Sequence, residues 1–115
     1  MRRGEVWWAD LREPRGSEPG FSRPFVIVQA DGFNRSTIRT VIGVVLSTNL
    51  TLAEMPGNVL VEAGASGLPK DSVANVTQLI TVDRAFVRDR VGALPGNVMQ
   101  AIDDGLRLVL SLSGM

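Results

Sequence analysis

The sequence predicts a mainly β protein, in which a small, closed or nearly closed β-barrel is capped by one C-terminal α-helix. About six or seven short runs rich in β-branched and aromatic residues are separated by turn residues at intervals of roughly 8–12 positions. Only the last stretch of the chain places apolar residues at helical spacing. A barrel of this size has its interior filled by side chains, so a functional site is expected on the rim loops or across a dimer interface.

The expected strands follow one another along the chain, and each ends at turn residues. They are residues 4–11, 25–29, 38–46, 58–62, 72–76, 79–82 and 90–94. One helical turn is expected within 31–36 and another over 85–88. In the first strand Val6 and Trp8 should point inward and Trp7 outward or into an interface. Gly43 predicts a bend or bulge in the third strand.

The terminal helix is predicted from apolar residues that share one helical face, with polar residues on the other. The apolar residues are Val98, Ile102, Leu106, Val109 and Leu110. Asn97 followed by Gln100 fits a capping box, and Gly114 is a plausible stop. Gly105 inside this helix costs about 1 kcal/mol relative to alanine, so tertiary packing must hold the helix in place.

Composition favours one folded domain spanning residues 1–115 and excludes several kinds of chemistry. The chain is 44% hydrophobic and 21% charged, with no cysteine and no histidine. Disulfides, thiolate sites, the common zinc sites, Ser-His-Asp triads and paired-histidine RNA cleavage are therefore excluded. Charges interrupt every apolar run before it reaches membrane-spanning length, and no segment resembles a signal peptide, so we expect a cytoplasmic protein.

The charge balance does not by itself indicate a polyanionic partner. The chain has 12 basic and 12 acidic residues, so its formal net charge is zero. Eleven of the basic residues are arginine and only Lys70 is lysine. Arginine suits bidentate phosphate contacts, but a high-GC genome gives the same bias, and we favour the genomic explanation.

The segment from residue 15 to residue 29 holds the clearest candidate site. Gly16, Ser17, Pro19 and Gly20 are loop formers, and Phe25 begins a short apolar strand. A proline belongs at the first residue of a strand because it cannot donate to the sheet, and it extends the residue before it. Arg23-Pro24 would therefore hold a guanidinium at the mouth of the strand, beneath a loop that carries Glu18.

Polar residues leave or interrupt two further strands. Ser47 and Thr48 end the third strand, while Asn75 and Gln78 interrupt the fifth. In a small barrel such points can converge with Arg23 on one rim, and we expect them to do so.

Several stretches together resemble the MazF/PemK family of bacterial toxin endoribonucleases, in order from about Arg3 to Leu112. They are RGEVWWADL, GSEPGFSRPFVIVQ, LSTNL, PGNV, GLPKDSVANVTQLITVD and RVGAL. The resemblance implies an SH3-like small barrel of the kind shared by MazF, PemK and CcdB, working as a homodimer. It also implies metal-independent cleavage of single-stranded RNA at short sequences, in which the 2′-hydroxyl attacks and leaves 2′,3′-cyclic phosphate and 5′-hydroxyl ends.

The resemblance assigns catalytic roles residue by residue. The family's R-P arginine falls on Arg23, its strand-end hydroxyl on Ser47 with Thr48 beside it, and its G-S-E acid on Glu18. The family usually has threonine where this chain has Ser47, so either hydroxyl can be the functional one. Arg23 would stabilise the transition state and Glu18 would take the 2′-hydroxyl proton. The alternative for Glu18 is a surface carboxylate paired with Arg15 or Arg23.

The same resemblance indicates residues that contact RNA and a protein partner. Gln78 matches a recurrent glutamine, and Thr77 stands where several relatives carry Asp or Glu, which hints at an altered base preference. The RNA-binding candidates are Trp7, Ser17, Phe21, Asn49, Asn75, Thr77 and Gln78. A cognate antitoxin with an acidic, disordered tail would occlude the RNA groove. We expect no cofactor, metal or membrane partner.

Two other functions remain open from the sequence. The first is a non-enzymatic toxin on the same barrel that poisons DNA gyrase, which would lean on its C-terminal residues and need no arginine–hydroxyl pair. The second is a plain SH3-like binding module for peptides or RNA.

Overall fold

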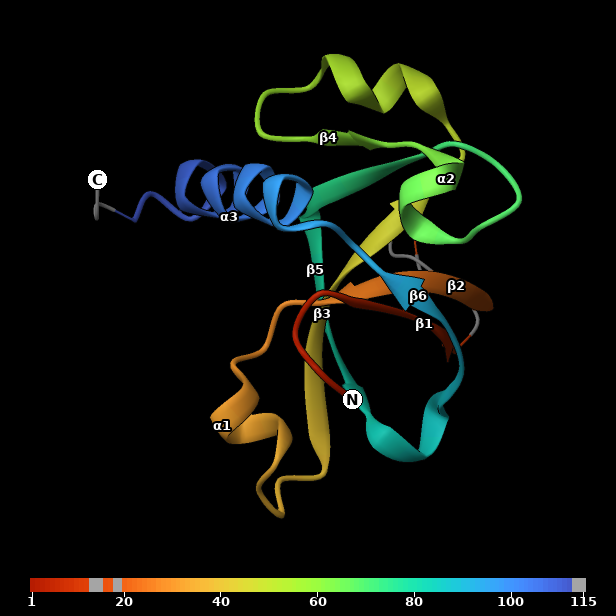
Figure 1. Cartoon of the computed structure of the whole chain (residues 1–115), viewed down its shortest axis with the longest axis vertical. Helices are drawn as coiled ribbons and strands as arrows, with labels where there is room; N and C mark the ends of the chain where they lie inside the picture. The colour runs from red at the N-terminus through yellow and green to blue at the C-terminus, as the bar shows by residue number, and fades with distance from the viewer. Residues whose placement is uncertain (13–15, 18–19, 113–115) are drawn as a thin grey trace.

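The computed structural model describes residues 1–12, 16–17 and 20–112. Its centre is one curved, antiparallel six-stranded sheet with the order β4-β5-β3-β2-β1-β6 (Figure 1). The strands are β1 Glu5–Asp10, β2 Ser22–Ile27, β3 Thr40–Ser47, β4 Val59–Val61, β5 Ser72–Asp83 and β6 Val87–Ala93. Helix α3, Gly96–Val109, follows β6. The prediction of a mainly β fold with a C-terminal helix is confirmed.

The sheet has two edge strands, β4 and β6, and a short helix lies against one of them. Helix α2, Ala63–Ser66, packs on β6 so closely that a Cβ at Gly92 would lie 2.6 Å from the carbonyl oxygen of Ser66. The other short elements are α1 Asp31–Asn34 and the 3₁₀ turns η1 Leu50–Glu54 and η2 Arg84–Phe86. The sequence predicted the turns near α1 and η2 but not α2 or η1.

Both faces of the curved sheet carry apolar clusters, which explains the two tryptophans. Val6, Val44 and Ile102 belong to a core cluster beneath α3, and Trp8 packs against its edge. Trp7 packs against a second cluster that contains Phe25. Trp7 therefore does not point fully outward, because a sheet this curved carries apolar clusters on both of its faces, and the alternative that Trp7 lies in an interface stays a prediction.

Gly43 serves close packing rather than a bulge. A Cβ at this position would lie 2.0 Å from Cδ2 of Phe25, so only glycine leaves room for that ring. The irregularity in the pairing of β3 with β5 falls between Val44 and Leu46. This irregularity lies at Val45, two residues after Gly43, and its extra residues belong to β5, so the bulge predicted at Gly43 is wrong.

Helix α3 begins and packs differently from the prediction. Its N-cap is Pro95, without a side-chain capping bond, so the predicted Asn97–Gln100 capping box is wrong. Gly105 is buried against Gly57 and Val76, which gives the interior glycine a packing reason. The predicted stop, Gly114, lies outside the described residues. Among the helices that the structure describes, none combines the length and apolar character needed to cross a bilayer.

Candidate active site

Side chains from the three polar segments line one cavity of about 410 Å³, here called the Arg23 cavity. Its walls come from the loop before β2, from the end of β3, from η1 and from the middle of β5. The lining residues are Gly16, Ser17, Gly20, Phe21, Arg23, Val45, Leu46, Ser47, Leu52, Asn75 and Gln78. The expected convergence of Arg23, Ser47, Asn75 and Gln78 is therefore present.

Strand register sets Arg23 and Ser47 at the same level of the sheet. Phe25 pairs with Val45 and Val26 with Val44, and continuing that register by two residues places Arg23 opposite Ser47. Strand β2 begins at Ser22, where it already pairs with β1. Arg23 therefore lies within the strand, whereas the sequence placed it just before the strand. Pro24 falls where β2 pairs with β1 alone, a position that tolerates its missing donor.

A wide irregularity in β5 brings the amide side chains to the cavity. Val44 of β3 pairs with Leu79 and Leu46 pairs with Ala74, so the four residues 75–78 stand opposite Val45 alone. The predicted strands 72–76 and 79–82 are thus one strand, and the polar residues between them form its bulged part. Bulges of this kind re-aim side chains next to functional sites.

Asn58 joins the bulge to η1 through two hydrogen bonds, and it was not among the predicted site residues. Its Oδ1 accepts a hydrogen bond from the backbone N–H of Val76 at 3.0 Å, and its Nδ2 donates to the carbonyl oxygen of Leu52 at 3.0 Å. Leu52 lines the cavity from η1, an element that the sequence did not predict. The only signal in the sequence is the turn-forming pair Pro56-Gly57 just before Asn58, because asparagine side chains at turns often hydrogen-bond to backbone groups.

The Arg23 guanidinium is available for an anion. Its Nε donates to the carbonyl oxygen of Gly20 at 3.2 Å, and its terminal amino groups make no hydrogen bond or ion pair with any residue that the structure describes. No carboxylate is among the described lining residues. Among the described lining residues Arg23 is thus the only charged one, and its two terminal amino groups can donate in parallel to a phosphate or carboxylate.

The two candidate hydroxyls face different cavities. Ser47 lines the Arg23 cavity, and its Oγ accepts a hydrogen bond from the backbone N–H of Asn49 at 3.1 Å, which leaves its own hydrogen to donate. Thr48 lines a neighbouring cavity of about 170 Å³, here called the Lys70 cavity, which Arg23 also lines. Ser47 is therefore the hydroxyl that shares the larger cavity with the guanidinium.

Separate hydrogen bonds hold the two amide side chains of the bulge. Asn75 is 8% exposed, and its Oδ1 accepts a hydrogen bond from the Thr77 hydroxyl at 2.9 Å. Gln78 Nε2 lies 3.5 Å from the carbonyl oxygen of Ser17, which joins β5 to the first loop. Thr77 itself is exposed and lies outside the lining, so it acts on the cavity only through Asn75.

Of the remaining candidate residues, one lies at the Arg23 cavity, two lie away from it, and one falls outside the described residues. Phe21 is 62% exposed at the cavity with a positive φ of 59°, a strained backbone for a bulky residue. Trp7 does not line the cavity and donates from its indole to Glu5 at 3.1 Å, and Asn49 caps η1 through Thr51. The structure therefore does not bring Trp7 or Asn49 to the Arg23 cavity. Glu18 lies outside the described residues.

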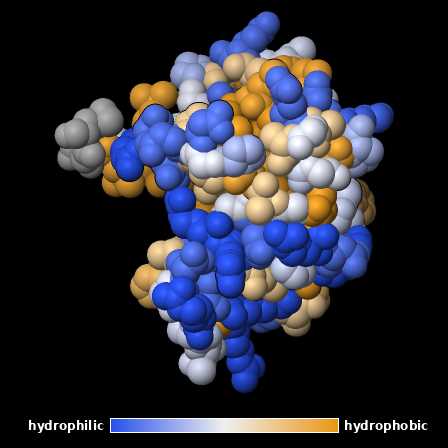
Figure 2. All heavy atoms as spheres, in the orientation of Figure 1, coloured by the Kyte–Doolittle hydropathy of each residue, from blue (hydrophilic) through white to orange (hydrophobic). Residues whose placement is uncertain are grey.

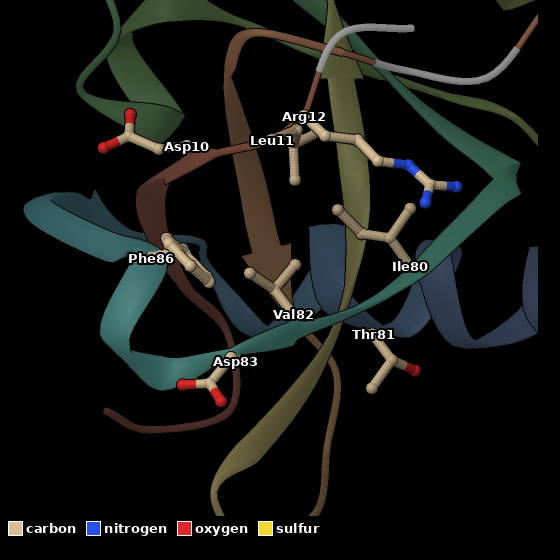
Figure 3. Close-up of a pocket in the computed structure, with 8 residues that line it drawn as sticks. All are labelled: Asp10, Leu11, Arg12, Ile80, Thr81, Val82, Asp83 and Phe86. Carbon is tan, nitrogen blue, oxygen red and sulfur yellow. The ribbon is translucent and has the colours of Figure 1, made fainter. Parts of the chain in front are cut away.

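A larger groove of about 750 Å³ lies elsewhere and offers less chemistry (Figure 3). Leu11, Ile80, Val82 and Phe86 form much of its wall, with acidic groups at Asp10 and Asp83. Both carboxylates already have partners: Asp10 accepts from Ser22 and Arg88, and Asp83 accepts from the backbone of Ala85. These bonds lower the pKa of Asp10, the one from Ser22 most and then that from Arg88.

No cluster of three or more acidic, histidine or cysteine side chains suited to a metal ion occurs in residues 1–12, 16–17 and 20–112. The Arg23 cavity itself presents guanidinium, hydroxyl and amide groups.

Comparison of the sequence with known proteins identifies the family of this chain. Residues 2–110 match the model of the PemK-like, MazF-like toxins of type II toxin–antitoxin systems. The chain belongs to this family. Two related MazF-type proteins are "Endoribonuclease MazF6" of Mycobacterium tuberculosis and "Endoribonuclease EndoA" of Bacillus subtilis. The first is 46% identical, covering 97% of this chain and 98% of the relative. The second is 32% identical, covering 97% and 96%.

Solved structures agree with the MazF-like fold. A mycobacterial endoribonuclease in complex with its cognate antitoxin superposes with a TM-score of 0.80, covering 100% of this chain and 99% of that one at 23% identity. At this identity the likeness speaks for the fold alone. The SH3-like MazF/PemK architecture implied by the sequence resemblance is therefore confirmed.

Proposed function

We propose that this MazF-family protein is a toxin endoribonuclease that cleaves single-stranded RNA at short sequences and is neutralised by a cognate antitoxin. The observation that carries this proposal is the Arg23 cavity, where an unpaired guanidinium and a donating hydroxyl share one wall with two amide side chains. The printed names of both relatives, which are endoribonucleases, support the same activity. A gyrase poison or a binding module would not need this pair.

The proposed reaction is a transesterification within the RNA. The 2′-oxygen forms a bond to the adjacent phosphorus, its proton passes to a base, and the bond from phosphorus to the 5′-oxygen breaks. A proton delivered to that leaving oxygen completes a 5′-hydroxyl end, and the other product carries a 2′,3′-cyclic phosphate. No water is consumed in the step.

Arg23 would carry most of the stabilisation in this step. Negative charge grows on the nonbridging phosphate oxygens, and the two terminal amino groups of the guanidinium can donate to them in parallel. One preorganised donor of this kind is worth about 3–4 kcal/mol, or roughly 10²–10³ in rate. Ser47 would donate a further hydrogen bond to the phosphate. Glu18 remains the proposed acceptor of the 2′-hydroxyl proton, an assignment that rests on the sequence alone.

Unpaired bases would be bound by the rest of the cavity wall. Phe21 offers an exposed ring for stacking at the mouth, and Asn75 and Gln78 offer amides for base edges. Ser17, which lines the cavity beside Gln78, would help position the chain. Thr77 would contribute by orienting Asn75.

The test is incubation of the purified protein with an unstructured RNA in EDTA, followed by analysis of the ends. We expect discrete cuts with cyclic phosphate and 5′-hydroxyl ends, no cuts with Arg23→Ala, and normal cuts with Arg35→Ala. Arg35 is an exposed arginine at the end of α1, so this control removes an equal charge outside the cavity. RNA that stays intact with the wild-type protein would exclude the enzyme.

The proposed antitoxin would occupy the same cavity. A carboxylate-rich segment of the antitoxin would bind the free guanidinium of Arg23 and exclude the phosphate of the substrate. The mycobacterial fold neighbour, which was solved with its cognate antitoxin, is consistent with such a partner.

The proposed homodimer has an apolar face to form it. Ile42, Leu79, Leu110 and Leu112 are 36–56% exposed and line one groove of about 320 Å³ at the end of α3, where Figure 2 also shows hydrophobic residues. An exposed apolar patch of this kind marks an interaction surface, and a second copy would cover it symmetrically. Leu110→Asp should convert the dimer to a monomer in light scattering after gel filtration, and an unchanged mass would exclude this face.

A further inference from the structure

The Lys70 cavity lies beside the Arg23 cavity and has no part in the cleavage step proposed for Arg23 and Ser47. The two cavities share Arg23 and Leu46, while Ser47 lines one and Thr48 the other. The two successive residues Ser47 and Thr48, at the end of β3, therefore line two neighbouring cavities. A phosphate bound by Arg23 would have the Arg23 cavity on one side and the Lys70 cavity on the other.

The lining of the Lys70 cavity combines apolar walls with a second cation. Trp8, Leu68 and Pro69 supply the walls, and Lys70 stands at the cavity without an ion pair to any residue of the described part of the chain. No carboxylate is among its described lining residues. Its volume of about 170 Å³ is below the roughly 300–1,000 Å³ of pockets for drug-sized ligands, and so suits a single ring.

The loop that carries Lys70 is fixed in place. Gly67 has a φ of 86°, and a Cβ there would lie 2.8 Å from the carbonyl oxygen of Val91. The backbone N–H of Leu68 donates to Ser66 Oγ at 3.0 Å, and Asp71 accepts from the backbone N–H of Ala63 at 2.8 Å. A cation and an apolar wall on such a loop are preorganised for a ligand and lose little freedom when it binds.

Trp8 is held equally firmly. It packs against the buried core cluster, and the guanidinium carbon of Arg88 lies 6.0 Å from its ring centroid. An indole that is half-buried and fixed in this way offers a rigid surface to a flat ring.

We propose that the Lys70 cavity binds one of the two nucleotides that flank the cleaved phosphate, while the other occupies the Arg23 cavity. The base lies against the Trp8–Pro69 wall, and Lys70 binds the next phosphate along the chain. This inference rests on the proposed ribonuclease function and adds to it a second nucleotide subsite with a named phosphate contact.

The single lysine allows a direct test. A short RNA that contains the mapped cleavage sequence, with a 2′-deoxynucleotide at the cleaved bond, binds without being cut. Acylation of Lys70 by an amine-reactive ester is measured by mass spectrometry with and without this RNA, using the α-amino group of Met1 as the internal reference. We expect the RNA to slow acylation of Lys70 severalfold and to leave Met1 unchanged. Removing the base of one flanking nucleotide, but not of the other, should abolish that protection.

The second test measures cleavage kinetics and RNA affinity for matched variants of Lys70. Lys70→Ala should raise KM about five- to tenfold with kcat unchanged, and should reduce the slope of log affinity against log salt by about 0.7. Lys70→Arg should restore both, and Arg35→Ala should behave as wild type. Equal acylation of Lys70 with and without RNA, or a Lys70→Ala variant that matches Arg35→Ala, overturns the subsite. If the wild-type protein still cuts RNA in that case, the proposed function stands without it.

Discussion

Asn75 accepts a hydrogen bond from the hydroxyl of Thr77 at 2.9 Å, and this bond orients the Asn75 carboxamide in the wall of the Arg23 cavity. The carboxamide oxygen of Asn75 uses one of its two lone pairs in this bond, and its amino group donates to no residue that the structure describes, so both of its hydrogens are available to a ligand. An amino group can donate to a keto oxygen or a ring nitrogen of a base, but it cannot pair with an exocyclic amine. Two side chains two residues apart in a bulged strand therefore set the polarity of one recognition contact.

Asn75 should accordingly select keto bases. We expect cuts to be enriched where uracil or guanine contacts this position. Asn75→Asp presents only acceptors, so it should weaken cleavage and shift the preference toward adenine or cytosine. Thr77→Val removes the orienting hydroxyl and should relax the preference while kcat changes little. Mapping of cut sites on a long defined RNA measures all three, and an Asn75→Asp variant with the wild-type cut sites would contradict the assignment.

Ser47 and Thr48 should differ in their effect on the chemical step. Ser47→Ala removes the donor that shares the cavity with Arg23, and a lost preorganised donor typically lowers kcat by about 10²–10³. Thr48→Ala should act mainly on KM, because Thr48 lines the Lys70 cavity. Single-turnover rates at saturating protein separate the two effects. Ser47→Thr is the control that keeps the hydroxyl, and equal losses for both alanine variants would contradict the distinction.

Gly105 should resist replacement by a better helix former. Alanine gains about 1 kcal/mol in helix propensity over glycine. At this position, however, its Cβ would lie 2.0 Å from the carbonyl oxygen of Gly57 and 3.1 Å from Cγ1 of Val76. Overpacking of this kind costs about 1–3 kcal/mol, so Gly105→Ala should lower the free energy of unfolding. Gly96→Ala, with no atom within 4 Å of the new Cβ, should not. Urea denaturation compares the two.

Glu5 should contribute stability that is lost in acid. Burial by itself raises the pKa of this carboxyl, but hydrogen bonds from Arg90, Trp7 and the backbone of Arg2 outweigh it, so the pKa is lowered from 4.5. A carboxylate with a lower pKa in the folded than in the unfolded state stabilises the fold above its unfolded pKa. That contribution disappears as the pH falls through the folded pKa.

The measurement is the unfolding free energy between about pH 6 and pH 3, a window that spans the ordinary pKa of glutamate. Glu5→Gln should be less stable than wild type at pH 6, and the difference should shrink as the pH falls. Glu54→Gln, at an exposed carboxylate of η1, should follow the wild-type curve. A difference between Glu5→Gln and wild type that is constant with pH would exclude titration of Glu5 as the cause.

The sequence predicted most of the strands, the terminal helix and the polar residues Arg23, Ser47, Asn75 and Gln78 of the Arg23 cavity, because these follow from local chemistry. The strands could be predicted from their β-branched runs, and the place of Arg23 from the Pro24 that follows it, without knowledge of contacts between distant residues. The bulge at residues 75–78 could not, since it depends on the register of β3 against β5 and on Asn58, which bonds to Val76 across the fold. For the same reason the prediction gave two strands where there is one.

Other errors have a similar origin. Trp7 was expected to face outward or into an interface, whereas this sheet is curved and carries an apolar cluster on each side, one of which Trp7 contacts. Gly43 was interpreted as a bulge, although its role is to leave room for the ring of Phe25. Close approaches between distant segments leave no signature in the residue pattern of either segment.

The account depends most on Arg23 stabilising the phosphate during cleavage. The direct test is the single-turnover cleavage rate of Arg23→Ala on an RNA with one mapped site, beside the affinity of the same variant for the uncleavable 2′-deoxy RNA. We predict a rate lower by about 10²–10³, with an affinity that falls far less, and wild-type values for Arg35→Ala. An Arg23→Ala rate within about threefold of wild type would contradict the account, because a group that stabilises the transition state cannot be removed at so small a cost.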